Sequence, residues 1–291
     1  MDNNRRFPLI LSSFWLKIIA LLTMTIDHIG FSFSIEAFRY IGRLALPLFC
    51  FMIAEGAIHT KNFKKYALRL GIMASALSLV ILLSQEIPYF RNNGLSMRDE
   101  GVIFIDLLLG AVAVYLLRQK KWYIKILAIL PLAYGITSYA VSAYECVGCG
   151  STVHWFPYFM RAQYGWYGIL LIIGFYAAHL LGQLFINYRS SITGIDKDLY
   201  KGSNLERHAL NIISVLVLAV ITVIYYICEN IVSDVFGSNT LFAIQPYAII
   251  SGAFILLYNG MRGYNKKWFQ YGSYLYYPLH MLVIGLLQLF I

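Results

Sequence analysis

The chain has 291 residues, of which 59% are hydrophobic and only 13% are charged, and its formal net charge is +9. This composition leaves too little polar surface to cover a water-soluble globule of this size. The basic residues stand in short clusters between long apolar runs and not along one soluble face, which argues against a nucleic-acid-binding protein. The sequence therefore predicts an integral membrane protein that has lipid as its solvent.

Nine apolar runs are long enough to be transmembrane helices, since a helix needs about 20 residues to cross the hydrocarbon core. The run that follows Arg5 and Arg6 contains Asp27 and His28 and lacks a convincing cleavage site, so we expect a retained helix and not a signal peptide. No repeat or long linker divides the chain, and we predict one all-α bundle over residues 1–291. The expected spans are 13–34, 38–59, 66–87, 101–118, 122–142, 165–187, 207–230, 241–260 and 268–290.

The connections between these spans alternate in charge. One side is basic and the other mostly acidic, and cytoplasmic loops carry the excess of Lys and Arg. We therefore expect the amino terminus inside, the carboxyl terminus outside, and a multi-pass protein of the cell (plasma or inner) membrane. The basic side holds Arg5, Arg6, Lys61, Lys64, Lys65, Arg118, Lys120, Lys121, Arg189, Lys197, Lys201, Arg207, Arg262, Lys266 and Lys267.

Ionisable side chains within the spans are candidate functional residues, because an unpaired charge is costly in a bilayer. Asp27 and Arg43 are expected at similar depth in neighbouring antiparallel helices, so we predict that they pair, either within an active site or as a packing contact. Neighbouring residues on a helix point about 100° apart, so Asp27 is not expected to orient the His28 ring. The full set is Asp27, His28, Arg43, Glu55, Asp106, His179 and His280.

Lys17 and His28 lie on one face of the first helix. Their spacing corresponds to about three turns and separates the side chains by roughly 16 Å along the axis. This arrangement suits a cytosolic donor with phosphates at one end and a reactive group on a long arm. Lys17 would pair with phosphate and His28 would meet the reactive group; the alternative is a snorkelling lysine that anchors the helix at the interface.

Two prolines lie beside candidate residues. Pro47 removes the helical hydrogen bond to the carbonyl of Arg43. Pro278, two residues before His280, removes the one to the carbonyl of Tyr274, so we expect kinks at both places. His280 lies near mid-membrane in the expected last span. It is interpreted either as a buried structural histidine or as a site residue.

Two further pairs of polar residues have structural interpretations. Glu55 and His59, four residues apart, are expected to support each other near the inner interface. Cys146 and Cys149 stand in an expected outer loop where a disulfide is permitted, and whether they are bridged stays open. A zinc half-site there lacks a second pair of ligands, so no metal site is predicted.

Several segments resemble the TraX family, whose founding members are membrane acetylases of conjugative pilin. The resemblance covers nearly the whole chain and is strongest over residues 15–90 and at the carboxyl terminus. The matching segments are 16–20 (LKIIA), 26–30 (IDHIG), 41–49 (IGRLALPLF), 54–56 (AEG), 64–70 (KKYALRL), 86–90 (EIPYF), 164–168 (YGWYG) and 276–280 (YYPLH).

The resemblance implies an acetyl-CoA-dependent acyltransferase, because the family is similar to transmembrane acyltransferases that move an acyl group from cytosolic acyl-CoA to an acceptor across the membrane. In that wider group a basic residue, ten intervening residues and a histidine recur, and Lys17 to His28 is similar to that signature. His28 is then the expected catalytic base. Asp27 and Arg43 are expected at the catalytic centre, where Arg43 would stabilise an oxyanion.

The resemblance also implies binding residues on the two sides of the membrane. Lys17 and Glu55 are assigned to acetyl-CoA, and His280 and Glu86 to the acceptor. The acceptor is expected to be an extracytoplasmic amine or hydroxyl, on a pilin-like protein terminus or a cell-surface glycan. The segment around Cys146 and Cys149 and the connection 188–206 contain none of the recognised motifs, so the acceptor, the choice of N- or O-acetylation, the acyl length and the oligomeric state stay open.

Two other classes of protein compete with this interpretation. A proton-coupled transporter or flippase also buries Asp, Arg and His among proline-broken helices, although the inverted repeat expected of many transporters is absent by eye. A non-catalytic scaffold or sensor is disfavoured by the number of intramembrane ionisable groups. The sequence has neither a Gly-x-Ser-x-Gly elbow nor a phosphate-binding loop, and so signals neither serine hydrolysis nor ATP-driven work.

Overall fold

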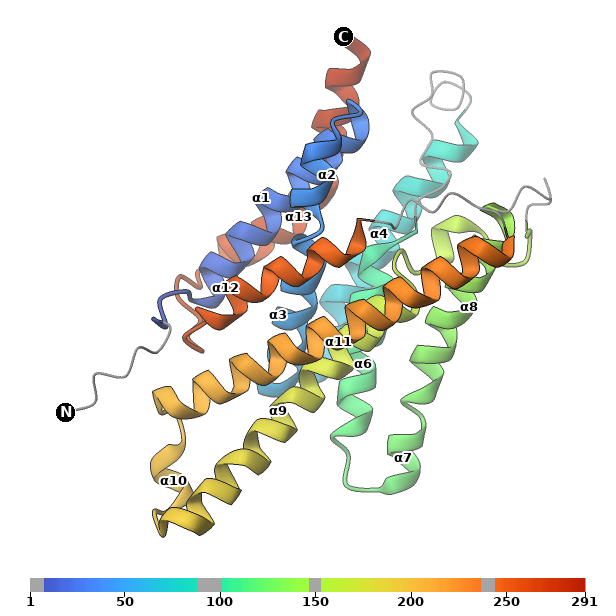
Figure 1. Cartoon of the computed structure of the whole chain (residues 1–291). Coiled ribbons are helices and arrows are strands. Elements are labelled where there is room, and N and C mark those ends of the chain that lie inside the picture. Colours follow the sequence, from blue (N-terminus) through green and yellow to red (C-terminus); the bar gives the residue numbers. More distant parts are fainter. Residues whose placement is uncertain (1–7, 88–100, 147–152, 237–243, 291) are drawn as a thin grey trace.

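The computed structural model describes residues 8–87, 101–146, 153–236 and 244–290 (Figure 1). Within these ranges every regular element is a helix, and one isolated parallel bridge joins Leu11 to Tyr258. The all-helical prediction is confirmed. The α-helices are α1 Ser13–Ser32, α2 Glu36–Gly42, α3 Ala45–His59, α4 Phe63–Glu86, α6 Ile103–Leu117, α7 Trp122–Ile126, α8 Ile129–Cys146, α9 Trp166–Thr193, α10 Lys197–Tyr200, α11 Asn204–Phe236, α12 Gly252–Leu256 and α13 Lys267–Phe290. Two 3-10 helices, η1 Tyr158–Met160 and η2 Gln245–Ser251, complete the fold.

Six helices of the described chain are long and apolar enough to cross a membrane, so the protein is a multi-pass membrane protein. Two shorter apolar helices, Ile103–Leu117 and Gln245–Leu256, stand where two further spans are expected. The helix α13 matches the ninth expected span in position but is not among the six. The total of nine crossings therefore stays a prediction. The six are Ser13–Ser32, Glu36–His59, Phe63–Glu86, Trp122–Glu145, Trp166–Thr193 and Asn204–Ser233.

The expected span 38–59 corresponds to one span, Glu36–His59, whose regular helix is interrupted at Arg43 and Leu44, both of which keep αR backbone angles. The helix α2 ends at Gly42 and α3 begins at Ala45, so Arg43 lies in the break. Pro47 falls in the first turn of α3, where a missing N–H removes no intrahelical hydrogen bond. The break therefore precedes the proline, whereas α13 continues through Pro278. The expected span 122–142 is likewise divided, into α7 and α8.

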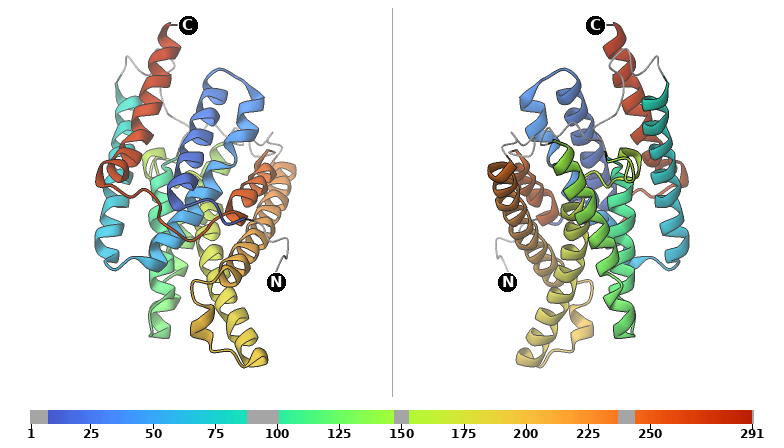
Figure 2. Two further views of the ribbon diagram at one scale, coloured as in Figure 1. Left: turned by 90° about the vertical axis from the view of Figure 1, so that its left-hand side faces the viewer. Right: turned by 90° about the vertical axis from the view of Figure 1, so that its right-hand side faces the viewer.

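Small residues let the two longest helices pack closely. Gly174, Ala178 and Gly182 lie four residues apart on α9, and α11 runs beside this face (Figure 2). A Cβ atom on Gly174 would come within 2.5 Å of the Ile221 side chain and 2.8 Å of Val217. Close contact of this kind holds membrane helices together, since lipid supplies little hydrophobic driving force between them.

The helix α3 occupies the middle of the bundle and packs against α1, α6 and α9 (Figure 1). In contrast, α13 packs mainly along α1. The α6–α7 turn and the α9–α10–α11 connection lie at one end of the molecule, and the carboxyl-terminal end of α13 lies at the other (Figures 1 and 2). Basic residues predicted to share one side, such as Arg118 and Lys201, thus fall at a common end.

Candidate functional site

The predicted pairing of Asp27 with Arg43 is confirmed. Arg43 Nη2 donates to both carboxylate oxygens of Asp27, at 2.8 and 3.1 Å, and both residues are buried. Arg39 Nη1 lies 3.1 Å from the same carboxylate. Arg43 also donates weakly to Gln245 Oε1 at 3.5 Å, which links the break between α2 and α3 to η2. One carboxylate is therefore shared by two guanidinium groups.

Two glycines allow the backbone to pack closely around the ion pair. The Gly42 Cα faces the Asp27 carboxylate so closely that any side chain at this position would collide with it. A Cβ on Gly30 would lie 2.7 Å from Phe38 Cβ, so this glycine lets α2 fold back against α1. The backbone of the motif around Asp27 is therefore as important to the geometry as its charges.

His28 does not contact Asp27 through its ring, as helix geometry predicts. Its Nδ1 lies 3.0 Å from the carbonyl oxygen of Met24 and 3.1 Å from His280 Nε2. Both histidines are buried, and their ring centroids are 4.9 Å apart. The structure thus brings His280 to His28 from the far end of the sequence.

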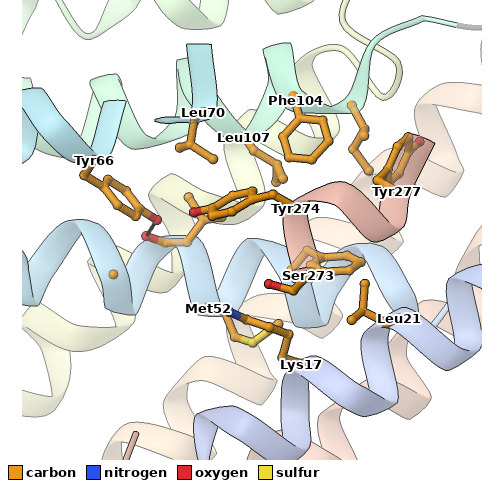
Figure 3. Close-up of a pocket in the computed structure, with 14 residues that line it drawn as sticks. Lys17, Leu21, Met52, Tyr66, Leu70, Phe104, Leu107, Ser273, Tyr274 and Tyr277 are labelled. Atoms are coloured by element: carbon orange, nitrogen blue, oxygen red, sulfur yellow. Dashed lines mark hydrogen bonds between the residues drawn. The ribbon is translucent and has the colours of Figure 1, made fainter. Parts of the chain in front are cut away.

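A cavity of about 180 Å³ lies between α1, α3, α4, α6 and α13 (Figure 3). Among the lining residues Lys17 carries the only charge, and the walls are otherwise apolar apart from a few hydroxyl groups. The lining residues are Lys17, Leu21, Phe49, Met52, Ile53, Gly56, Tyr66, Leu70, Ile103, Phe104, Leu107, Ser273, Tyr274 and Tyr277.

This cavity leads from Lys17 toward the histidines. The lining residues run along α1 from Lys17 to Leu21 and along α13 from Ser273 to Tyr277 (Figure 3). On both helices the cavity therefore extends toward the histidines. The Tyr277 ring centroid lies 6.2 Å from that of His28. Tyr277 therefore forms the wall between the cavity and the histidine pair.

The surroundings of Lys17 are positively charged and aromatic. The ammonium group lies 5.7 Å from the centroid of the Phe269 ring, and the charge of Arg69 on α4 also acts on it. Within the described chain no carboxylate forms an ion pair with Lys17. A cation held in this way is suited to bind an anionic ligand.

A buried carboxylate fixes the segment before α9. Asp106 is fully buried on α6 and accepts hydrogen bonds from the backbone N–H groups of Gln163, at 2.7 Å, and Tyr164, at 3.2 Å. Burial raises the pKa of the Tyr164 phenol, and the nearby positive charge of Arg43 partly offsets that rise. Tyr164 therefore keeps its proton at neutral pH beside the ion-paired arginine.

A second buried ion pair fixes the other end of the same segment. Arg161 Nη1 and Nη2 bind the Glu145 carboxylate at 2.6 and 2.9 Å, and Arg161 Nε donates to the Phe156 carbonyl. The guanidinium also lies 4.1 Å from the Tyr158 ring centroid. These contacts make residues 153–165 an ordered cap over the bundle, as the aromatic composition of the loop suggests.

The other predicted site residues lie apart from the histidines. Glu55 sits beside Gly56 of the cavity wall, but its carboxylate faces Arg207 at 3.4 Å and His59 at 3.9 Å. The predicted support between Glu55 and His59 is therefore present. Glu86 is exposed at the end of α4, and none of the contacts described at the His28 centre involves it. Their assignments to donor and acceptor stay predictions.

The cysteine prediction falls partly outside the described residues. Cys149 lies there, and the side chain of Cys146 is not described. In the ranges that are described, no cluster of three or more His, Cys, Asp or Glu side chains is arranged to hold a metal ion.

Sequence reasoning missed four residues at the centre. Arg39 was given no role, although its position four residues before Arg43 places both on one helical face. Tyr164 stands inside a matching motif but was given no role. Gln245 carries no signal of its own, because only the packing of η2 brings it to the site. Tyr277 stands in the matching segment 276–280 but was given no role.

Comparison with known proteins supplies an independent observation. The sequence model described as "TraX protein" matches residues 12–193, well over half of the chain. The chain belongs to the TraX family. The match contains Lys17, Asp27, His28 and Arg43, and so the family resemblance read from these motifs is confirmed.

One curated relative of this TraX family member is the "probable fimbrial assembly protein FimC, serogroup H1" of Dichelobacter nodosus. It is 43% identical over 72 residues, which cover 22% of this chain and 30% of the relative. The alignment thus spans less than a third of the relative's length. No solved structure matches the chain.

Proposed function

We propose that the protein is a membrane acyltransferase that takes an acetyl group from acetyl-CoA and transfers it across the membrane to an acceptor amine or hydroxyl. The observation that supports this most is the cavity, because it joins the Lys17 cation, which has no carboxylate partner among the described residues, to the wall of the His28 centre through apolar surroundings. Membership of the TraX family supports the same reaction class.

The donor would enter from the end of the molecule that carries the basic connections. Lys17 would bind a phosphate of CoA, and the pantetheine arm would follow α1 and α13 toward Tyr277. Glu55 with its partner Arg207 stands near the same end of α3 and is retained as a contact of the donor's polar part. The acetyl thioester would then reach His28 in the interior of the bundle.

The transfer step needs a base and a cation near the thioester. His28 removes a proton from the acceptor N–H or O–H, whose lone pair attacks the thioester carbonyl carbon. Arg43, held by Asp27, stabilises the negative charge that develops on the carbonyl oxygen. The C–S bond breaks, and the CoA thiolate takes the proton from the His28 imidazolium. In the alternative route His28 Nε2 first attacks the thioester carbon and the C–S bond breaks to release CoA. The acceptor N–H or O–H then attacks the acetyl-histidine, which breaks the bond between the acetyl carbon and His28 Nε2 and passes the acceptor proton to the histidine.

The acceptor would approach from the other end, past the cap formed by residues 153–165. Exposed Glu86 is retained as an acceptor-side residue, and His280, whose ring contacts His28, would reach the acceptor only through that histidine. The relative named for fimbrial assembly favours a pilin-like protein as acceptor over a cell-surface glycan. The whole relative is much longer than the aligned part, so this preference rests on a shared segment only.

The membrane arrangement proposed with this function has nine crossings in the plasma or inner membrane, with the amino terminus inside and the carboxyl terminus outside. The short apolar helices α6 and η2–α12 and the helix α13 would supply the three crossings beyond the six long ones. This arrangement places Lys17 on the side where acetyl-CoA is made.

The decisive experiment uses purified protein in lipid nanodiscs with radiolabelled acetyl-CoA and no acceptor. We expect specific donor binding and slow release of free CoA. His28→Ala should keep binding and lose release by roughly 100-fold, the usual contribution of a general base. His154→Ala, an exposed histidine outside the cavity lining, is the control and should behave as wild type.

Two outcomes would contradict the proposal. If His28→Ala, correctly inserted and expressed, releases CoA at the wild-type rate, the assigned base is wrong. If the wild-type protein does not bind acetyl-CoA at near-cellular concentration, the transporter or flippase becomes the better explanation, because only an acyltransferase needs the donor.

A further inference from the structure

The two buried histidines form a hydrogen-bonded pair whose proton positions can be assigned from their neighbours. His280 Nδ1 lies 2.9 Å from the carbonyl oxygen of Tyr276, and His28 Nδ1 lies 3.0 Å from that of Met24. A carbonyl oxygen accepts hydrogen bonds and never donates them. In the neutral rings both Nδ1 atoms therefore carry the proton, which leaves both Nε2 atoms with a free lone pair.

The contact between the rings agrees with this assignment. His280 Nε2, without a proton, faces His28 Nδ1 at 3.1 Å. The His28 Nδ1–H group is thus shared between the Met24 carbonyl and the His280 lone pair. The opposite tautomer of His28 would place two lone pairs against each other and would leave the Met24 carbonyl facing an acceptor.

The position of His280 is itself fixed by aromatic contacts. The Tyr276 ring stacks on the imidazole with centroids 5.3 Å apart and planes within 7°, and the Tyr277 ring meets it edge-on at 5.4 Å. The Thr25 hydroxyl donates to the Leu21 carbonyl at 2.9 Å. The Tyr276 hydroxyl, 2.7 Å from Thr25 Oγ1, is then the donor in that contact and ties α13 to α1 beside the pair.

We propose that His280 is a positioning residue that holds His28 in the Nδ1–H tautomer and so keeps His28 Nε2 free as the base. This inference rests on the proposed function, in which His28 deprotonates the acceptor. The role is indirect: His280 acts on the substrate through His28, because its own Nε2 is directed at the other ring and its Nδ1 at a carbonyl.

The kinetic test compares two variants in nanodiscs. His280→Gln keeps an acceptor oxygen near the place of Nε2, and His280→Phe keeps a planar ring without an acceptor. We expect His280→Phe to lower kcat for CoA release by roughly 10- to 100-fold, within the range of a general-base contribution. The KM for acetyl-CoA should stay unchanged, and His280→Gln should recover most of kcat. Thermal unfolding of each variant is measured in parallel.

The second readout needs no catalysis. Nitrogen-15 NMR of protein labelled in its histidine rings distinguishes a protonated ring nitrogen from a bare one, and the signals lost in His28→Ala identify His28. The wild type should show Nδ1–H with bare Nε2 for His28. In His280→Phe the Met24 carbonyl is the one remaining acceptor described for His28 Nδ1–H, so the Nε2–H form should become detectable beside Nδ1–H, and His280→Gln should restore the single form.

Either of two results overturns the inference. One is an Nε2–H tautomer of His28 in the wild type. The other is an equal loss of kcat in the Gln and Phe variants with the His28 tautomer unchanged, which would mean that His280 contacts substrate or only fills space. If the wild type neither binds nor cleaves acetyl-CoA, the proposed function fails, while the NMR experiment still decides the tautomer.

Discussion

At the scale of single residues, the centre depends on one buried carboxylate between two arginines. Arg43 is almost fully buried, whereas Arg39 is partly exposed, so the two guanidinium groups are not equivalent. Removing one partner of a buried ion pair costs about 3–5 kcal/mol, because the other charge is left without compensation. The arrangement therefore constrains Asp27 and Arg43 far more strongly than Arg39, whose side chain is partly exposed.

Gly42 makes this arrangement sensitive to a single methyl group. We expect Gly42→Ala to displace the Asp27 carboxylate from Arg43, to destabilise the protein by about 1–3 kcal/mol as an overpacked site does, and to reduce CoA release. Gly71→Ala on α4 is the matched control, since a Cβ there meets no atom within 4 Å. Thermal unfolding and CoA release measure both effects. Wild-type stability and CoA release in Gly42→Ala would contradict the prediction, because they would mean that the added Cβ fits beside the Asp27 carboxylate.

At the scale of elements, the helices differ in how they are held. The helix α13 is attached to α1 through specific polar contacts, namely the hydroxyl pair of Thr25 and Tyr276 and the histidine pair. Such contacts replace extensive packing and leave space beside α13 for the cavity. By contrast, α9 and α11 are held by close approach at glycines. The first pair of helices contributes the two histidines to the site, and the second pair packs closely elsewhere in the bundle.

The close approach of α9 and α11 predicts a specific sensitivity. Gly174→Ala should lower the stability by about 1–3 kcal/mol, because its Cβ would press on Ile221 and Val217. Gly272→Ala in α13, where a Cβ meets nothing within 4 Å, should leave stability unchanged or slightly raised. Thermal unfolding in one detergent compares the two variants. Equal stabilities would mean that the α9–α11 interface can separate without cost.

At the scale of the whole molecule, chain segments from both ends enclose the site. The helix α1 contributes Lys17 and His28, the break between α2 and α3 contributes Arg43, η2 contributes Gln245, and α13 contributes His280. Residues 153–165 cover the bundle through the Asp106 and Arg161 contacts. In the proposed function, the donor and the acceptor would reach this enclosed site from opposite ends of the molecule.

The proposed nine crossings can be tested by accessibility. An epitope tag after Ile291 should be reached by antibody or protease from outside intact cells. Tags in the α6–α7 turn and beside Asp196 should be reached only after the membrane is opened. If the tag after Ile291 is also protected while the tag beside Asp196 stays inside, α13 does not cross the membrane. The proposed path of the pantetheine arm along α13 would then be wrong.

The sequence by itself determined that the protein has lipid as its solvent, that it is all-helical, and that Asp27 pairs with Arg43. Hydropathy and helix length are local properties, so the runs that become α1, α4, α9 and α11 can be recognised without any knowledge of packing. The pairing of Asp27 with Arg43 was also predictable, because residues close in sequence on adjacent antiparallel helices have few depths at which to meet.

Tertiary structure alone decided the remainder. His28 and His280 are 252 positions apart, and no periodicity indicates that α13 should lie along α1. The order of helices in a membrane depends on many small packing contacts and a few polar ones, which local patterns do not encode. The break at Arg43, the cavity beside α13 and the proton assignment of His28 all follow from that order, and so only the folded arrangement could supply them.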